Sequence, residues 1–432
     1  MIKTLKMEPS SKSTSLSVLV DPSLFMYICL FQDGIFDDLR PKYAAWRQES
    51  RKAKIQFERI YFLDSIEDHS YVLHEAIATH DLELVKRIVR CNRLGGRHTM
   101  DFAANHGTLE IVKHLHFNHA DGCTKLAMDY AAHSGKLDIL QFLHQHRNEG
   151  FSRGILDFGA QNGFLDVVRF LNEDVGVPCS TKAMDWAARN GHLDVVKYLH
   201  ENRSEGCTVD AIDHAAKNGH FHVVQYLHKQ NKPCTFLAMD YAAIHGHFQL
   251  VQFLHTHRQE GCTAQAMDNA ARYNFMDIVR FLHENRQEGC SPMAMDYAAA
   301  NGHFEMVCFL HSHRQEGCTT DAADYAAINR HLDVLRFLLE ERSEGCTEKA
   351  ALAAARDGYL DVLEILHTYQ SQLVETEAVL DKAIRNNQVE VIQYWCDIAK
   401  KAGRRLASHW ITLASRQTAI KLSTLDMLRT LL

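Results

Sequence analysis

The sequence predicts an all-α protein, a helical-repeat solenoid of about twelve helix-turn-helix units joined by short loops. One phrase returns throughout the chain, in the form Ala183-Met-Asp-Trp-Ala-Ala-Arg-Asn-Gly-His-Leu-Asp-Val-Val-Lys-Tyr-Leu-His200. Equivalent glycines, such as Gly163 and Gly191, lie 28 positions apart. A repeat of this length is typical of solenoids, because such a unit is too small to bury its own apolar face and must stack on its neighbours.

Each unit is expected to begin with a hydroxyl residue that caps its first helix. In one copy Thr208 precedes a helix through Ala211-Ile-Asp-His-Ala-Ala-Lys217, and its hydroxyl can accept a hydrogen bond from an N–H at the helix start. The paired alanines Ala215 and Ala216 permit close packing between helices. The capping position elsewhere holds Thr124, Ser152, Ser180, Thr235, Thr263, Ser291, Thr319 and Thr347.

A turn glycine ends the first helix in most copies, because glycine adopts the left-handed conformation without a Cβ clash. Asn274 tolerates that conformation, whereas Arg330 does so less readily, and we expect strain or rearrangement at the Arg330 turn. The turn glycines are Gly107, Gly135, Gly163, Gly191, Gly219, Gly246, Gly302 and Gly358.

The second helix of each unit is represented by Leu193-Asp-Val-Val-Lys-Tyr-Leu-His200. Leu193, Val196 and Leu199 recur on one face at helical spacing. Together with Met184 and Ala187 of the first helix, they predict a continuous core that runs from repeat to repeat.

The run from Ala187 to Leu199 resembles the ankyrin repeat, in which two alanines are followed by Gly-His and a helix of the form Leu-Glu-Val-Val-x-Leu-Leu. The resemblance covers residues 72–368 and implies a non-enzymatic scaffold that binds partner proteins along a concave face. The unit is about five residues shorter than the usual ankyrin length of about 33. The missing residues fall where the family extends a β-hairpin finger, so we expect tight loops and almost no sheet.

An aspartate stands where the ankyrin family has a histidine, and it recurs in nine copies. A stripe of carboxylates could bind cations, but a polar group at a half-buried helix position more often bonds to backbone or cap groups of the next repeat. We favour the structural role, and we expect Asp213→Ala to destabilise the protein without abolishing binding. The aspartates are Asp101, Asp129, Asp157, Asp185, Asp213, Asp240, Asp268, Asp296 and Asp324.

Cysteine and histidine are abundant, with 12 and 28 copies. Most of the cysteines occupy one repeated position, and several histidines recur at another. Equivalent positions in stacked helices lie about 10 Å apart, which is too far for disulfides, so free thiols in a reducing compartment are expected. Pairs such as His255-x-His257 are explained by copying and lack the three or four convergent ligands of a metal site. A Cys207–His200 nucleophile and base would need an orienting third group, and none recurs with them. We therefore expect no enzyme activity, metal or other cofactor.

The best candidates for partner binding lie on the first helices. The residue after each aspartate is usually aromatic, which indicates either packing between repeats or an exposed anchor for a partner. The two residues before the turn glycine vary between copies, which indicates freedom from the packing of the repeat. The candidate contact residues are Tyr130, Trp186, Arg189, Asn190, Lys217, Asn218, Tyr241, Ile244, His245, Arg272, Tyr273, Tyr297, Asn301 and Tyr325.

The sequence divides into a flexible N-terminus at 1–15, a helical N-terminal cap at 16–70, the repeat array at 71–368, and degenerate repeats with a C-terminal cap at 369–432. Residues 17–46 are expected to form two or three short helices. They are weakly similar to an F-box, the module that recruits a ubiquitin ligase. The alternative function is therefore a substrate adaptor of a ubiquitin ligase, against a simple cap on the first repeat.

The composition of the chain indicates which classes of partner to expect. The net charge is -7, from 47 Lys plus Arg against 54 Asp plus Glu, which disfavours nucleic acid as the main partner. The first residues lack the apolar core of a signal peptide, and no later run is long enough to cross a membrane. We expect a monomer in the cytoplasm or nucleus whose partners are proteins.

Overall fold

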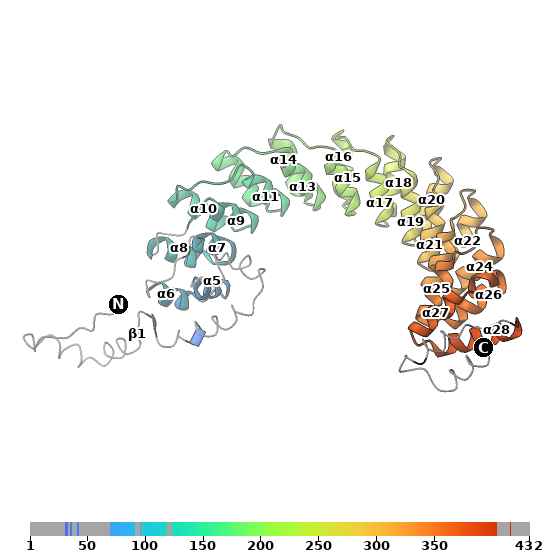
Figure 1. Cartoon of the computed structure of the whole chain (residues 1–432). Coiled ribbons are helices and arrows are strands. Elements are labelled where there is room, and N and C mark those ends of the chain that lie inside the picture. Colours follow the sequence, from blue (N-terminus) through green and yellow to red (C-terminus); the bar gives the residue numbers. More distant parts are fainter. Residues whose placement is uncertain are drawn as a thin grey trace, which may run out of the picture. The chain divides into compact units, whose positions relative to one another are not determined.

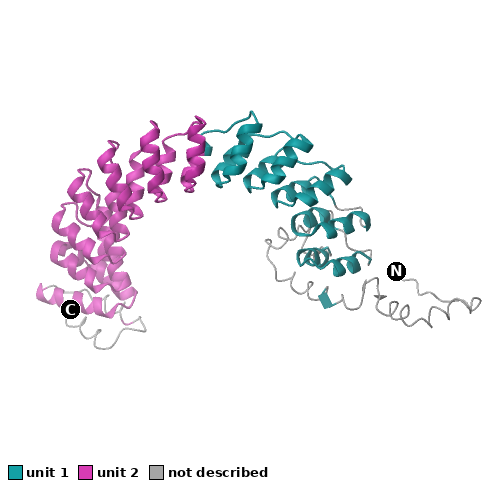
Figure 2. Cartoon of the chain, turned by 180° about the vertical axis from the view of Figure 1, so that it is seen from behind, with its two compact units in different colours: residues 1–211 teal, residues 212–432 magenta. Residues whose placement is uncertain are grey.

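The computed structural model describes residues 31–32, 35–36, 41–42, 70–90, 96, 98–118, 123–403 and 415. The chain divides into two compact units, residues 1–211 and 212–432 (Figure 2). Helices dominate the described residues, and from residue 71 onward they alternate as the first and second helix of successive repeats (Figure 1). The predicted all-α helical-repeat solenoid is confirmed.

The first helices are α5 (Tyr71–Ala78), α7 (Thr99–His106), α9 (Leu126–His133), α11 (Ile155–Gln161), α13 (Thr181–Arg189), α15 (Asp210–Lys217), α17 (Leu237–Ile244), α19 (Ala264–Arg272), α21 (Met293–Ala300), α23 (Thr320–Ile328), α25 (Glu348–Asp357) and α27 (Glu377–Arg385). The second helices are α6 (Leu82–Arg90), α8 (Leu109–Asn118), α10 (Leu137–His146), α12 (Leu165–Phe170), α14 (Leu193–Asn202), α16 (Phe221–Lys229), α18 (Phe248–His257), α20 (Met276–Asn285), α22 (Phe304–His313), α24 (Leu332–Glu341), α26 (Leu360–Val374) and α28 (Val389–Lys401). A π-helical turn, η2 (Leu171–Val175), extends α12.

Within each unit the first helices pack in one layer and the second helices in another. For example, α11 contacts α13 in the first unit, and α19 contacts α21 in the second. The paired alanines of the first helices are fully buried, as are Ala187 and Ala188, which allows neighbouring helices to approach closely. Met184, Val196 and Leu199 are also buried, so most of the predicted core is present. Leu193 is only half-buried, and Val195 is buried on the same helix.

Eight of the nine predicted hydroxyl caps are present, and the prediction is wrong at Ser152, because α11 has Gly154 as its N-cap and no side-chain cap hydrogen bond. The side-chain oxygen of Thr263 accepts a hydrogen bond from the backbone N–H of Gln265 at 3.2 Å. This contact satisfies one of the N–H groups that the first turn of a helix leaves without an internal partner. The same contact is made by Thr124, Ser180, Thr208, Thr235, Ser291, Thr319 and Thr347.

The turn after the first helix has one geometry in most repeats. Gly246 has φ +76°, and a Cβ there would lie 2.7 Å from the ring of Phe275 in the next repeat. The expected rearrangement at Arg330 is wrong, because Arg330 adopts φ 61° and keeps the same turn hydrogen bonds. Its guanidinium bonds to Asp361 and lies 5.2 Å from the ring centre of Tyr359, contacts that offset the cost of the left-handed conformation.

Two sequence expectations fail near the N-terminus. Gly107 does not adopt the left-handed conformation but an extended one, with φ -80° and ψ -177°. The helices expected within residues 17–46 are wrong at β1 (Phe31–Gln32) and β2 (Ile35–Phe36), which pair antiparallel. The sequence between these strands is Asp-Gly, a dipeptide typical of two-residue hairpin loops, and aromatic and β-branched residues flank it.

Candidate partner-binding surface

The aspartate ladder joins each repeat to the next. One carboxylate oxygen of Asp240 accepts a hydrogen bond from the backbone N–H of Thr263 at 2.8 Å, and the other accepts one from the Thr263 hydroxyl at 2.7 Å. That hydroxyl in turn accepts from the N–H of Gln265. All nine ladder aspartates make the same pair of contacts with the cap of the following repeat.

These contacts confirm the structural interpretation of the ladder. The aspartates are buried, with at most 7% of each exposed, and burial raises the pKa of Asp157, Asp240, Asp268 and Asp296 despite the hydrogen bonds. At the first described repeat, His74 takes the aspartate's place and its Nε2 contacts the Thr99 hydroxyl at 3.1 Å. Both carboxylate oxygens serve the fold, so the ladder is not the ligand stripe that was the alternative.

A second ladder occupies the loops and was not predicted. Arg258 pairs with Glu260 two residues on, at 2.6 Å. In the next copy, Glu288 of the Arg286–Glu288 pair also accepts a hydrogen bond from the backbone N–H of Cys262 in the preceding loop, at 3.4 Å. The same ion pair recurs at Arg147–Glu149, Arg203–Glu205, Arg286–Glu288, Arg314–Glu316 and Arg342–Glu344. The repeated Arg-x-Glu-Gly-Cys sequence was the available signal. The loop therefore clamps adjacent repeats together.

The repeated cysteines are free within the described residues. Burial raises the pKa of Cys262 to about 12 and that of Cys234 to about 11. A thiol with such a pKa is protonated at neutral pH and is a weak nucleophile.

The repeated histidines of the second helices pack against aromatic rings. The ring centre of His255 lies 5.3 Å from that of Phe281, edge to face, and His311 meets Phe337 in the same way. The described residues contain no group of three or more His, Cys, Asp or Glu side chains that could hold a metal ion. These histidines fill the space between neighbouring second helices.

The candidate aromatic residues lie on the first helices or, for Tyr273, directly after one, and we call the surface that they form the first-helix face. Tyr130, Trp186, Tyr241 and Tyr297 are half-buried there. Tyr273 and Tyr325 are exposed, with 49% and 46% of their surface accessible. Some of these aromatic side chains are therefore partly packed between repeats and others are exposed, and the sequence left both cases open.

Cationic side chains stack on several of these rings. The Lys182 ammonium lies 5.7 Å from the ring centre of Trp186, and that of Lys217 lies 5.3 Å from the ring centre of Tyr241. The Arg272 guanidinium lies between the rings of Tyr273 and Tyr297, at 5.6 and 4.8 Å. The first-helix face thus presents aromatic and cationic groups that hold each other in place.

Some candidate residues also serve the fold. The Asn190 amide donates to the backbone carbonyl of Gln161 in the preceding repeat at 2.6 Å, and Asn301 donates to the carbonyl of Tyr297 at 2.8 Å. These contacts satisfy carbonyl groups at the ends of first helices. Ile244 is half-buried and His245 exposed, and burial lowers the pKa of His245, with the neighbouring Lys217 adding to the effect.

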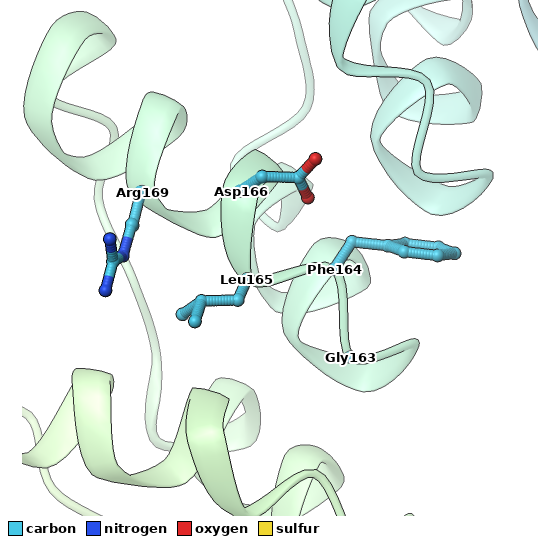
Figure 3. Close-up of a pocket in the computed structure, with 5 residues that line it drawn as sticks. All are labelled: Gly163, Phe164, Leu165, Asp166 and Arg169. Carbon is cyan, nitrogen blue, oxygen red and sulfur yellow. The ribbon is translucent and has the colours of Figure 1, made fainter.

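A shallow pocket of about 400 Å³ lies at the start of α12 (Figure 3). Phe164, Leu165, Asp166 and Arg169 line it beside Gly163. Phe164 also covers Gly135 of the preceding repeat. The sequence gives no sign of this pocket, because the residues that line it occupy ordinary positions of the repeated turn and second helix.

Most of residues 17–46, which carry the F-box-like pattern, lie outside the described residues, and the adaptor alternative stays a prediction. No helix in the described part of the chain is long and apolar enough to cross a membrane.

Family models for ankyrin repeats match the repeat array. A model of ankyrin repeats in many copies matches residues 128–171 and 184–228. A model of three copies matches residues 212–294, 239–324 and 267–349. No curated protein matches the chain.

Proposed function

We propose that this chain, which belongs to the ankyrin-repeat family, is a non-enzymatic scaffold that binds partner proteins on its first-helix face. Ankyrin repeats are generally protein–protein interaction modules, and stacked repeats present a long continuous surface for such contacts. We also propose where this chain binds its partner and which residues anchor the partner.

The observation that carries the proposal is the exposure of aromatic residues on the first-helix face. About half of the surface of Tyr273 and of Tyr325 is accessible, although Tyr325 lies on α23 and Tyr273 directly follows α19, helices whose other faces are buried. Partly exposed tyrosines on a preorganised surface are common anchors at protein interfaces, because they bury a large area at little cost in conformational entropy.

The packing of the repeats favours the first-helix face as the concave side. Pairs of buried alanines separate neighbouring first helices, whereas Phe and His rings separate neighbouring second helices. Layers with unequal spacing curve a stack toward the more closely packed layer. A concave face lets one partner contact several repeats at once, so affinity would be spread over consecutive repeats.

Affinity purification from cells tests the proposal. The full chain would be compared with Tyr273→Ser/Tyr325→Ser, and with Phe117→Ser/Tyr369→Ser as a control that removes two exposed aromatic residues from second helices. Partner proteins retained by the full chain and the control, but lost by the first variant, would support the proposal. Equal retention by all three proteins would contradict it.

The adaptor alternative is tested by the same purification. Loss of ubiquitin-ligase subunits when residues 1–60 are removed, with other partners kept, would favour the adaptor. An unchanged partner set would favour residues 16–70 as a cap on the array. We further propose that the chain acts as a monomer in the cytoplasm or nucleus, which is consistent with its free thiols.

A further inference from the structure

Charge is segregated in the first unit between the two layers of helices. The first helices α9, α11 and α13, with their caps, carry exposed cations and only three carboxylates, Asp129, Asp157 and Asp185. Those three are buried, and both oxygens of each are bonded to the next cap. The exposed cations of this surface, which we call the cationic face, are Lys125, Arg153, Lys182 and Arg189.

The second helices of the same repeats have the opposite character. Two cations, Arg169 and Lys197, stand among six carboxylates on α10, α12, η2 and α14. The carboxylates are Asp138, Asp166, Glu173, Asp174, Asp194 and Glu201. The caps of these helices add three more cations, each with a bonded partner: Lys136 donates to the Gly107 carbonyl, and Arg147 and Arg203 pair with Glu149 and Glu205. Although the chain as a whole is acidic, the first helices of these three consecutive repeats expose cations and no carboxylates. This arrangement gives that face a local positive potential.

Apolar rings lie between the cations of the cationic face. The ring of Phe158 lies 6.3 Å from that of His133 in the preceding repeat. On α13, Lys182, Trp186 and Arg189 follow the spacing i, i+4 and i+7, which places them along one side of the helix. Trp186 and Phe158 are half-buried, so each leaves part of its ring open to a partner.

We propose that the cationic face binds an acidic protein segment that places an apolar side chain on Phe158 or Trp186. This inference rests on the proposed function and names the class of partner. Helices in contact lie about 8–10 Å apart, and an extended chain rises about 3.3 Å per residue. A segment of about six residues therefore spans α9 to α13, and a carboxylate at about every third residue would lie near a cation.

A protein segment fits this face better than a nucleic acid. A protein binds nucleic acid by neutralising many closely spaced phosphates. The cationic face offers only four cations, on a chain of net charge -7. The acidic second helices beside it would repel a long polyanion. A short acidic segment meets the cations and avoids that repulsion.

The test uses the full chain and fluorescein-labelled peptides of about twelve residues. Each peptide has a central Leu-Phe pair in a background of Ser and Gly, with zero, three or six glutamates. Oligo-dT of similar charge is the nucleic-acid probe. The variant Lys125→Glu/Arg153→Glu/Lys182→Glu changes the cationic face. The variant Arg90→Glu/Lys113→Glu/Lys197→Glu makes the same change in net charge on second helices, where these residues are also exposed.

We expect affinity to rise with the number of glutamates, and the first variant to bind the six-glutamate peptide at least about tenfold more weakly than the wild type. The charge-matched control should change affinity by less than about twofold. Thermal unfolding of both variants checks that they fold.

Three results would overturn the inference. They are an affinity independent of glutamate number, equal losses in the two variants, and tighter binding of oligo-dT than of the acidic peptide through the same cations. If the first variant still retains every cellular partner that Tyr273→Ser/Tyr325→Ser loses, the scaffold function stands and only the acidic partner is wrong.

Discussion

The first-helix faces of the two units differ, although the repeats beneath them are built alike. In the first unit, α9, α11 and α13 expose lysine and arginine. In the second, α17, α19, α21 and α23 expose apolar side chains. Phe236, Tyr273, Met293 and Tyr325 are each 45–49% accessible, and the one arginine on these helices, Arg272, is stacked between two tyrosines.

The comparison shows how one repeat divides its positions between stability and surface chemistry. The ladder aspartate, the paired alanines and the hydroxyl cap are present in both units, because each of them contacts a neighbouring repeat. The residue after the aspartate and the two before the turn contribute less to those contacts, and they are free to make one face cationic and the other aromatic. Stability and specificity can therefore change independently in this chain.

The largest expected effect tests the part that the units share. Asp157→Ala in the first unit and Asp240→Ala in the second should each lower the free energy of unfolding by about 2–4 kcal/mol, because each leaves a buried N–H and a hydroxyl without their acceptor. Chemical denaturation measures the loss. Asp166→Ala and Asp277→Ala, at exposed positions on second helices, should each cost less than about 0.5 kcal/mol. A ladder substitution as mild as its control would show that the two units are not held by the same contact.

An intermediate effect should follow from moving the surface chemistry of one unit to the other. Ile244→Lys/Ala300→Lys adds cations to the second unit at the position that Arg189 occupies in the first. We expect affinity for the six-glutamate peptide to rise about threefold at low salt, and the gain to shrink as salt screens the charges. Fluorescence anisotropy measures it. Gln252→Lys/Ser312→Lys, with the same charge on second helices, should give a smaller gain, and an equal gain would mean that net charge alone decides.

The smallest expected effect is a pH dependence common to both units. Burial, helped by neighbouring arginines, lowers the pKa of His116 in the first unit and of His228 in the second below the ordinary value of 6.5. The native state then binds the proton less readily than the unfolded state. Stability is complete above about pH 6.5 and is lost as the pH falls through the native pKa.

Thermal unfolding between about pH 7.5 and pH 5.5 measures this loss. His228→Gln should reduce the fall in melting temperature by a small amount, whereas His222→Gln, exposed on the same helix, should leave it unchanged. A steeper fall in His228→Gln than in the wild type would contradict the assignment.

Periodicity made most of the scaffold predictable. The capping role of Thr263 and the structural role of Asp240 both follow from a polar group that recurs beside a buried helix start and must find a partner. The rearrangement considered at Arg330 does not occur, because contacts that come from the next repeat, with Tyr359 and Asp361, support its left-handed conformation. The hairpin at Phe31–Phe36 was missed because the apolar residues around it were assigned to helices.

The loops and the surface were less predictable. The Arg286–Glu288 clamp was overlooked because a charged pair two residues apart usually indicates a solvated turn, whereas the hydrogen bond from the backbone N–H of Cys262 to Glu288 shows that the pair joins repeats. Asn190 was selected as a variable surface residue, yet it bonds to the carbonyl of Gln161. Variation between copies thus indicates freedom from the core but not freedom from every contact. The contact residues themselves remain predictions.

The aspartate ladder also gives the chain a polarity. Nine joints are built from a carboxylate on one repeat and a cap on the repeat that follows. A break between two repeats would leave a buried acceptor exposed at the end of the N-terminal fragment. The C-terminal fragment would begin with a hydroxyl and an N–H that water can satisfy. At the last joint the ladder stops, and Leu352 takes the place of the aspartate. Fragments that begin at a cap should therefore be more stable than fragments that end at an aspartate. Repeats would be gained or lost more readily on the C-terminal side of a leucine such as Leu352.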